Sequence, residues 1–280
     1  MHLGDLEFRI LSDSTIGLDG GAMFGVIPKP LWEKVSPADS RNRVRLAMNC
    51  LLIRAAGKLI LVETGAGDKW NAKEMDIYDL ETSNRLPASL SAAGVRPSEI
   101  DIVVNTHLHF DHCGWNTRRD GDRIVPTFPN ARYVIQHDAY EHGKSPSERD
   151  RGSFRAENFL PIETAGQLQL VEGDTEIVPG VELIDIPGHT PGMQCVRLSG
   201  GGRSAFFFAD LVPTTAHLPL AWIMGFDLYP LTTLEYKKHW IPKVAREETL
   251  ALFAHDVTIP AAWLHEAEDG RVSAEPAVVD

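Results

Sequence analysis

The sequence has few cysteines, few basic residues and no long apolar run. Its three cysteines (Cys50, Cys113 and Cys195) are widely spaced in a chain of 280 residues, which argues against a disulfide framework. Lysine and arginine number 27 against 39 aspartates and glutamates, a balance that disfavours nucleic acid and anionic membranes as partners. Residues 1–7 lack the basic start and apolar core of a signal peptide, and no segment is long enough to span a bilayer. We therefore expect a cytoplasmic protein without nucleic-acid or membrane partners.

What the sequence does contain is a succession of short apolar segments separated by polar or helical ones. Strands are predicted over residues 6–11, 46–53, 59–63, 102–105, 133–136, 181–186, 194–198, 205–209 and 250–254. Helices are predicted over 86–93, 138–142 and 232–246, the last broken or kinked at Pro242, and segments 64–85 and 112–130 are predicted to be loop-rich. This mixture predicts an α/β layered protein and a single domain over residues 1–280.

Several of the predicted strands lead into a side chain that is able to bind or support a metal ion. These side chains are Glu63, His107, His189, Asp210 and His255. In layered α/β proteins, functional side chains gather beyond the carboxyl ends of strands, where they reach one crevice. We therefore expect these five residues to meet at one site.

Residues 106–112 form the densest group of potential metal ligands in the chain. His107 and His109 are two positions apart, so in an extended segment they point to the same side. Asp111 and His112 follow where the chain is expected to turn into a helix, and they are available to a second point nearby. Imidazole nitrogens and carboxylate oxygens are ligands of zinc-type cations. The segment therefore predicts a metal site.

Four motifs in this order resemble the metallo-β-lactamase superfamily of dinuclear metallohydrolases. They are His107-x-His109-x-Asp111-His112, Gly188-His189-Thr190-Pro191-Gly192, Ala209-Asp210 and His255. The resemblance implies a four-layer αββα sandwich with two mixed β-sheets. It also implies two divalent metal ions, one held by His107, His109 and His189 and the other by Asp111, His112 and His255, with Asp210 bridging them. Zinc is the expected metal, and iron, cobalt and manganese suit the same ligands.

Glu63 marks a departure from the family, which usually has an aspartate at this position. That aspartate supports a ligand imidazole from outside the metal site. The resemblance implies the same supporting role for Glu63, with one additional methylene in its side chain.

Residues 19–35 begin as an apolar segment rich in glycine and proline, which predicts a loop. Together with the motif positions, this segment resembles the branch that holds N-acyl-homoserine lactonases and methyl-parathion-hydrolase-type enzymes, in which such a loop lines the substrate pocket. The implied partner is a small molecule with an apolar portion, and the resemblance also implies a homodimer. The candidate substrate-binding residues are Met23, Phe24, Trp32, His217, Trp222 and Met224.

The expected reaction is the opening of an acyl lactone by a hydroxide held between the metals, with Asp111 passing a proton to the departing ring oxygen. The alternatives are a phosphotriesterase acting on aryl organophosphates and a thioesterase of the glyoxalase II kind. Many homoserine lactonases have a tyrosine three positions after the bridging aspartate, where this chain has Pro213. Thr214, His217 and Tyr229 are the candidates to replace its hydrogen bond.

Overall fold

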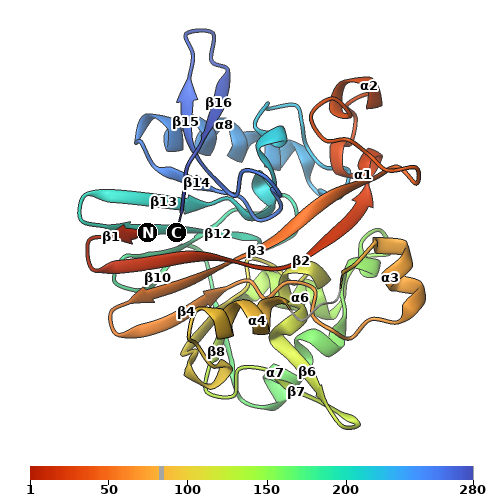
Figure 1. The fold of residues 1–280 in the computed structure, drawn as a ribbon, viewed down its shortest axis with the longest axis vertical. Helices are drawn as coiled ribbons and strands as arrows, with labels where there is room; N and C mark the ends of the chain where they lie inside the picture. Colours follow the sequence, from red (N-terminus) through yellow and green to blue (C-terminus); the bar gives the residue numbers. More distant parts are fainter. Residues whose placement is uncertain (82–84, 280) are drawn as a thin grey trace.

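Two seven-stranded sheets form the centre of the computed structural model, which describes residues 1–81 and 85–279 (Figure 1). The first sheet contains, in spatial order, β1 (His2–Leu3), β2 (Leu6–Asp19), β3 (Arg43–Ala55), β4 (Lys58–Val62), β5 (Ile102–Val104), β8 (Arg132–Gln136) and β9 (Leu168–Val171). The second contains β10 (Thr175–Val178), β11 (Val181–Asp185), β12 (Gln194–Gly200), β13 (Arg203–Phe207), β14 (Leu250–Leu252), β15 (Ala261–Glu266) and β16 (Val272–Pro276). Both sheets are mixed, because β4, β5, β8 and β9 pair in parallel in the first and β13 pairs in parallel with β14 in the second.

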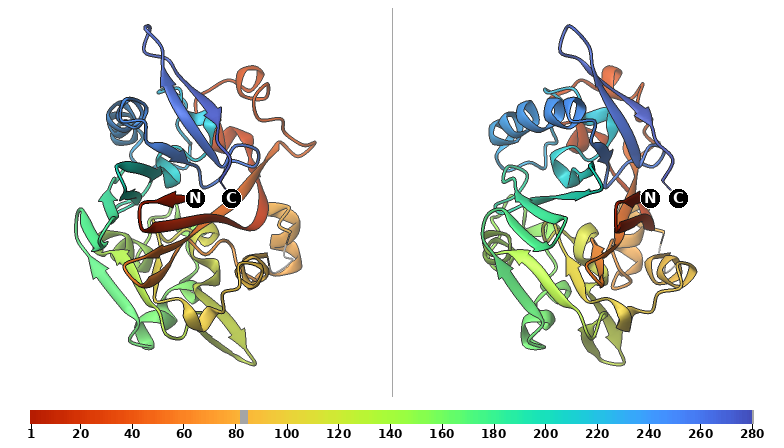
Figure 2. Two further views of the ribbon diagram at one scale, coloured as in Figure 1. Left: turned by 60° about the vertical axis from the view of Figure 1, so that its left-hand side comes forward. Right: turned by 90° about the vertical axis from the view of Figure 1, so that its left-hand side faces the viewer.

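Helices cover the outer faces of the two sheets, so the molecule has four layers (Figure 2). The helices are α1 (Gly20–Phe24), α2 (Lys29–Trp32), α3 (Ala72–Tyr78), α4 (Arg85–Ala92), α5 (Phe110–Cys113), α6 (His137–Lys144), α7 (Leu160–Thr164) and α8 (Pro230–Arg246). Leu86 of α4, Tyr140 of α6 and Ile162 of α7 are buried against the first sheet. Trp240 and Ile241 of α8 are buried against the second. This arrangement confirms the predicted αββα sandwich.

The inner faces of the two sheets share one apolar core. Phe8 and Ile60 of the first sheet are buried in it together with Leu183, Phe207 and Leu252 of the second. Each such side chain contributes about 1.5–3 kcal/mol through its burial. The inner core therefore fixes the position of one set of strand ends relative to the other.

All nine predicted strands are present, but the sequence interpretation missed several weaker elements. Strands β1, β9, β10, β15 and β16 were not predicted, nor was the hairpin of β6 (Thr117–Asp120) and β7 (Arg123–Pro126). Segments 64–85 and 112–130 contain α3, the end of α5 and this hairpin, so they are less loop-rich than predicted; residues 82–84 lie outside the described part of the chain. Of the missed strands, β9, β10 and β16 are short and partly exposed, which removes the apolar signal by which strands are found.

Two predictions about local structure are corrected. Helix α8 continues through Pro242 to Arg246, so the predicted break does not occur, because packing of the helix against the second sheet outweighs the lost hydrogen bond. Segment 19–32 is not a plain loop, since α1 begins directly after β2. The Asp19 carboxylate accepts a hydrogen bond from the Ala22 backbone N–H, which caps this short helix.

Among the described residues, none of the helices is sufficiently long and apolar to cross a membrane.

Candidate metal centre

The ends of β5, β11, β13 and β14 bring the predicted ligands together between the two sheets. His107 and His109 follow β5, and α5 then presents Asp111 and His112. His189 follows β11, Asp210 lies in the 3-10 turn after β13, and His255 follows β14. All seven side chains are buried, from 0 % exposure for His107 to 8 % for Asp111. The structure thus gathers residues separated by almost 150 positions into one cluster.

The cluster divides into two groups of three residues. In the first, His107, His109 and His189 place one nitrogen each within 4.8 Å of one another. In the second, Asp111, His112 and His255 do the same with one ligand atom each. The two groups match the two ligand sets that the sequence resemblance implies.

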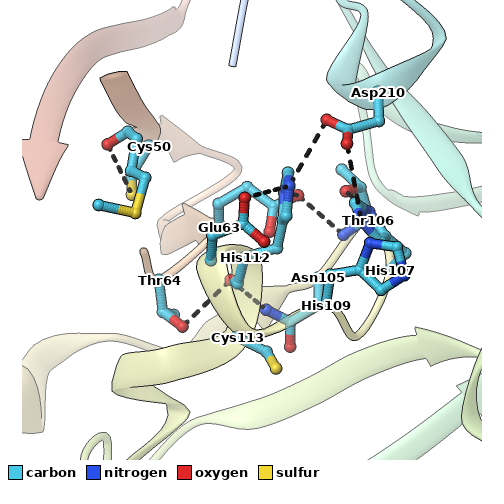
Figure 3. A network of polar contacts seen from close by, with 12 residues as sticks. Cys50, Glu63, Thr64, Asn105, Thr106, His107, His109, His112, Cys113 and Asp210 are labelled. Carbon is cyan, nitrogen blue, oxygen red and sulfur yellow. Dashed lines mark hydrogen bonds and ion pairs between the residues drawn. The ribbon is translucent and has the colours of Figure 1, made fainter. Parts of the chain in front are cut away.

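Asp210 lies between the two groups and directs one carboxylate oxygen to each (Figure 3). Its Oδ2 is 3.2 Å from His189 Nε2 and 3.9 Å from His107 Nε2. Its Oδ1 is 3.1 Å from His255 Nε2 and 3.5 Å from His112 Nε2. One carboxylate therefore faces both groups, which is the geometry expected of a bridging ligand.

The protonation of the imidazoles shows that the cluster fits a cation. His255 Nδ1 lies 2.7 Å from the Ala47 carbonyl oxygen; the carbonyl only accepts, so Nδ1 carries the proton and Nε2 presents a lone pair. His255 Nε2 faces His112 Nε2 at 3.1 Å, and the opposite His112 nitrogen faces the Glu63 carboxylate. The two nitrogens that face each other therefore need a shared positive charge between them, which is either a proton or a metal ion. A metal ion is able to supply that charge.

A buried polar atom that lacks a partner leads to the same conclusion. Within the described part of the chain, His107 Nε2 is buried and has no hydrogen-bond partner. Such atoms cost free energy when they are left unpaired, so they indicate an interaction with an ion. The donor set contains imidazole and carboxylate without thiolate, which suits zinc, iron, cobalt or manganese.

The electrostatics of the protein groups favour a bound positive charge. Burial, together with neighbouring imidazoles, holds the pKa of His107 and His109 well below its usual range, so these rings stay neutral and able to bind metal. Burial also lowers the pKa of His112, but the carboxylates of Asp210, Asp111 and Glu63 outweigh it and raise the value to about 10. The second group therefore attracts either a proton or a metal cation.

Hydrogen bonds from outside the cluster orient the ligand rings. Asp227 Oδ1 accepts a hydrogen bond from His189 Nδ1 at 2.9 Å, and this buried carboxylate was not identified from the sequence. Asp227 does not follow a predicted strand, so the sequence offered no signal for it. Thr106 Oγ1 lies 3.0 Å from His107 Nδ1 and orients that ring in the same way.

Glu63 lies on the side of His112 that faces away from Asp210 (Figure 3). One of its carboxylate oxygens is 3.5 Å from His112 Nδ1 and accepts a hydrogen bond from the Thr106 backbone N–H at 3.0 Å. The residue adopts a left-handed conformation with φ of 66°, which costs about 1–2 kcal/mol in a non-glycine residue. The longer side chain is thus in contact with a ligand imidazole, as its proposed supporting role requires.

A cavity of about 210 Å³ opens next to the two ligand groups. Apart from the ligands themselves, its wall consists of Leu18, Met23, Leu46, Tyr78, Phe110, Gly152, Ser153, Met224 and Phe226. Of the described residues that line it, none is a lysine or an arginine. The described wall is therefore mainly apolar beyond the candidate ligands and offers no lysine or arginine to neutralise a substrate anion.

Two of the six predicted substrate-binding residues line this cavity, and four do not. Met23 and Met224 form part of the wall, whereas Phe24, Trp32, Trp222 and His217 pack behind it. The ring of Phe24 stacks on Trp32 at 5.2 Å and on His217 at 4.7 Å, and it meets Trp222 edge-on at 5.7 Å. These four residues support the wall by packing, because both faces and an edge of Phe24 are covered.

The remaining cavity residues were not identified from the sequence. Leu18 and Leu46 lie in strands, and Tyr78, Ser153 and Phe226 come from segments far apart in the chain. In the sequence, each of them resembles an ordinary core or turn residue. Only the tertiary arrangement shows that they share one surface.

Known proteins provide an independent comparison. The metallo-beta-lactamase superfamily matches residues 44–266. An N-acyl homoserine lactonase of Bacillus cereus is 29 % identical over 232 residues, covering 77 % of this chain and 84 % of the lactonase. An N-acyl homoserine lactonase of Bacillus thuringiensis is 27 % identical over 229 residues, covering 76 % of this chain and 83 % of that protein.

Solved structures share the fold over the whole length. A crystal structure from Staphylococcus aureus, described as a probable metal-dependent hydrolase, superposes with a TM-score of 0.90 at 30 % identity and covers 100 % of both chains. AidC, described as a dizinc quorum-quenching lactonase, superposes with a TM-score of 0.82 at 21 % identity, covering 100 % of this chain and 97 % of its own. The motifs, the four layers and the family match agree, and the chain belongs to the metallo-beta-lactamase superfamily.

Proposed function

We propose that this metal-dependent hydrolase opens the ring of N-acyl homoserine lactones. The observation that carries the proposal is the position of Asp210, whose two oxygens face two separate ligand groups at the base of a cavity whose described wall is mainly apolar. The relatives in Bacillus cereus and Bacillus thuringiensis are N-acyl homoserine lactonases, which supports the choice of substrate.

The seven ligands would hold two divalent ions, and zinc is the metal we propose. When bound, such a pair supplies a nucleophile from water at neutral pH and polarises the carbonyl under attack. The residues of the chain provide the remaining functions. The hydrogen bonds to His189 and His255 fix the ligand rings, and the apolar wall orients the acyl chain.

Asp111 is placed to move the proton in this reaction. Its carboxylate lines the cavity, and its Oδ2 is 3.7 Å from both His112 Nε2 and His255 Nε2. As the new carbon–oxygen bond forms, the bond to the ring oxygen breaks, and the departing alkoxide takes up a proton. Asp111 accepts that proton from the attacking water and delivers it to the ring oxygen.

The charge of the cavity distinguishes among the alternative substrates. A glutathione thioester carries carboxylates, and no lysine or arginine is available for them among the described lining residues. This argues against the thioesterase alternative. A neutral phosphotriester meets the same requirements of charge and polarity as a lactone, so it is the second candidate. The cytoplasmic location and the homodimer stay predictions.

The test is an assay of the purified protein on three substrates with its metals in place: N-hexanoyl-homoserine lactone, paraoxon and S-lactoylglutathione. We expect the lactone to be preferred, with kcat/KM above about 10⁴ M⁻¹s⁻¹, and the thioester to be the poorest substrate. His109→Ala should abolish turnover, whereas His239→Ala, which removes an exposed histidine on α8, should leave it unchanged. No turnover of the lactone, or full activity in His109→Ala, would contradict the proposal.

A further inference from the structure

Pro213, three positions after Asp210, provides no side-chain hydrogen-bond donor for the substrate. Pro213 has no hydroxyl, and its carbonyl oxygen accepts a hydrogen bond from the His255 backbone N–H at 2.9 Å. During attack on an ester, negative charge develops on the carbonyl oxygen, and a donor held in place lowers the barrier. A protein donor for this oxygen has to be found elsewhere on the cavity wall.

None of the three replacements named from the sequence lies on that wall. Thr214 Oγ1 and His217 Nδ1 hydrogen-bond to each other at 2.8 Å, and His217 Nε2 bonds to the Met23 carbonyl oxygen at 3.0 Å. The polar atoms of both side chains are therefore already engaged. Tyr229 is 51 % exposed and does not line the cavity.

Two other hydroxyl side chains do line the cavity, Tyr78 and Ser153. Tyr78 is the last residue of α3 and shares the cavity with Asp111, Asp210 and His255. Within the described part of the chain, its phenol hydroxyl has no hydrogen-bond partner, although the side chain is partly buried. A partly buried donor without a partner, beside the ligand groups, is available to a substrate.

The ring of Tyr78 is held in place by its neighbours. It meets Trp70 edge-on at 5.6 Å and packs at an angle of 51° against Phe110 at 5.2 Å. Burial and the nearby charge of Asp111 raise the pKa of Tyr78, so the phenol keeps its proton at neutral pH. Ser153 has no such aromatic packing and ends an exposed turn over Arg151–Ser153. Tyr78 is therefore the better-ordered donor.

We propose that the Tyr78 hydroxyl donates a hydrogen bond to the carbonyl oxygen of the ester under attack. This inference rests on the proposed function, because it requires a neutral ester or lactone in the cavity. Tyr78, at the end of α3, thus provides the hydrogen bond that Pro213 is unable to donate. The same hydroxyl faces the phosphoryl oxygen of a phosphotriester when that is the substrate.

The test compares Tyr78→Phe with Tyr229→Phe, which removes the same hydroxyl from a tyrosine outside the cavity. Tyr78→Phe should lower kcat/KM for N-hexanoyl-homoserine lactone about 10- to 100-fold, mainly through kcat, because the bond strengthens as charge develops. Metal content and thermal midpoint should match the wild type, since phenylalanine preserves the ring contacts. Tyr229→Phe should be unchanged, and Ser153→Ala should change less than Tyr78→Phe.

The corresponding thiolactone keeps the carbonyl oxygen but has sulfur in place of the ring oxygen, so it distinguishes which of the two atoms accepts the hydrogen bond from Tyr78. A hydrogen bond to the carbonyl predicts the same fold-loss on both substrates, whereas a loss confined to the lactone would overturn the assignment. A Tyr78→Phe enzyme within twofold of the wild type on the lactone would overturn it as well. If the wild type turns over only paraoxon, the lactonase proposal fails, and the same variants tested on paraoxon decide the role of Tyr78. A wild type inactive on both substrates overturns both proposals.

Discussion

The metal-ligand cluster and the wall of the adjacent cavity share one site, yet different forces hold them. The ligand rings are fixed by hydrogen bonds, such as those from His189 to Asp227 and from His255 to the Ala47 carbonyl. The wall is held by apolar packing, with Phe24 stacked between Trp32 and His217 behind it. The comparison predicts that metal binding and substrate binding depend on separate sets of contacts. A change in one region should therefore leave the other largely intact.

The two regions also differ in where they lie along the chain. The ligands occupy strand ends and the first turn of α5, which the sheets hold rigidly. The wall combines residues of α1, α3 and segment 222–226, which carries Met224 and Phe226. Lys237 of α8 stabilises that segment from behind, since its ammonium donates to the carbonyl oxygens of Pro219 and Trp222.

The largest effect is expected from breaking the cluster at Asp210. Asp210→Asn preserves the size of the side chain but removes the charge that both ligand groups face. Activity should fall at least about 1000-fold, because metal ions contribute several kcal/mol to transition-state stabilisation and each 1.4 kcal/mol or so is tenfold. Metal analysis by mass spectrometry should show fewer metals per chain. Asp269→Asn, at an exposed position outside both regions, is the matched control, and equal losses in both variants would refute the specific role of Asp210.

An intermediate effect is expected from breaking the wall at Phe24. Phe24→Ala removes a fully packed ring and should lower the free energy of unfolding by about 3–4 kcal/mol, measured by urea titration. The KM for the lactone should rise as the wall loosens, while the metal content stays at the wild-type value. Loss of metal in this variant would show that the two regions are not independent.

A smaller effect is expected from Lys237, and it depends on pH. Burial lowers the pKa of Lys237 to about 7 in the folded protein, against about 10.4 in the unfolded chain. Between these values the unfolded chain binds the proton more tightly, so raising the pH favours the folded state. The stability of the wild type relative to Lys237→Met should therefore rise between pH 7 and pH 9, by about 1 kcal/mol per pH unit. A difference that stays constant over this range would refute the prediction.

The same comparison explains how much of the site was predictable from the sequence. His107, His109, Asp111 and His112 could be predicted as metal ligands because metal binding demands a few residue types at close spacing, and the structure places them in one cluster. The strands that lead to them were found because buried strands are continuously apolar. Asp227 and Tyr78 were missed because an aspartate in a turn and a tyrosine at a helix end are common residues. The hydrogen bond of Asp227 and the proposed role of Tyr78 both depend on contacts made across the fold.

Four of the six candidate substrate-binding residues pack behind the cavity wall, for a related physical reason. Phe24, Trp32 and Trp222 are large and apolar, and the sequence does not distinguish a side chain that faces a cavity from one that packs behind it. In the same way, Pro242 signals a helix break, but the packing of α8 against the second sheet outweighs the lost hydrogen bond. Tertiary packing decides both cases.

The central claim is that Asp210 joins two metal sites into one hydrolytic centre. The most direct test is a titration of the metal-free protein with zinc, followed by calorimetry and by opening of N-hexanoyl-homoserine lactone in the same samples. We predict that binding saturates at two zinc ions per chain and that full activity requires the second ion. Saturation at a single ion, or full activity before the second ion binds, would contradict this account.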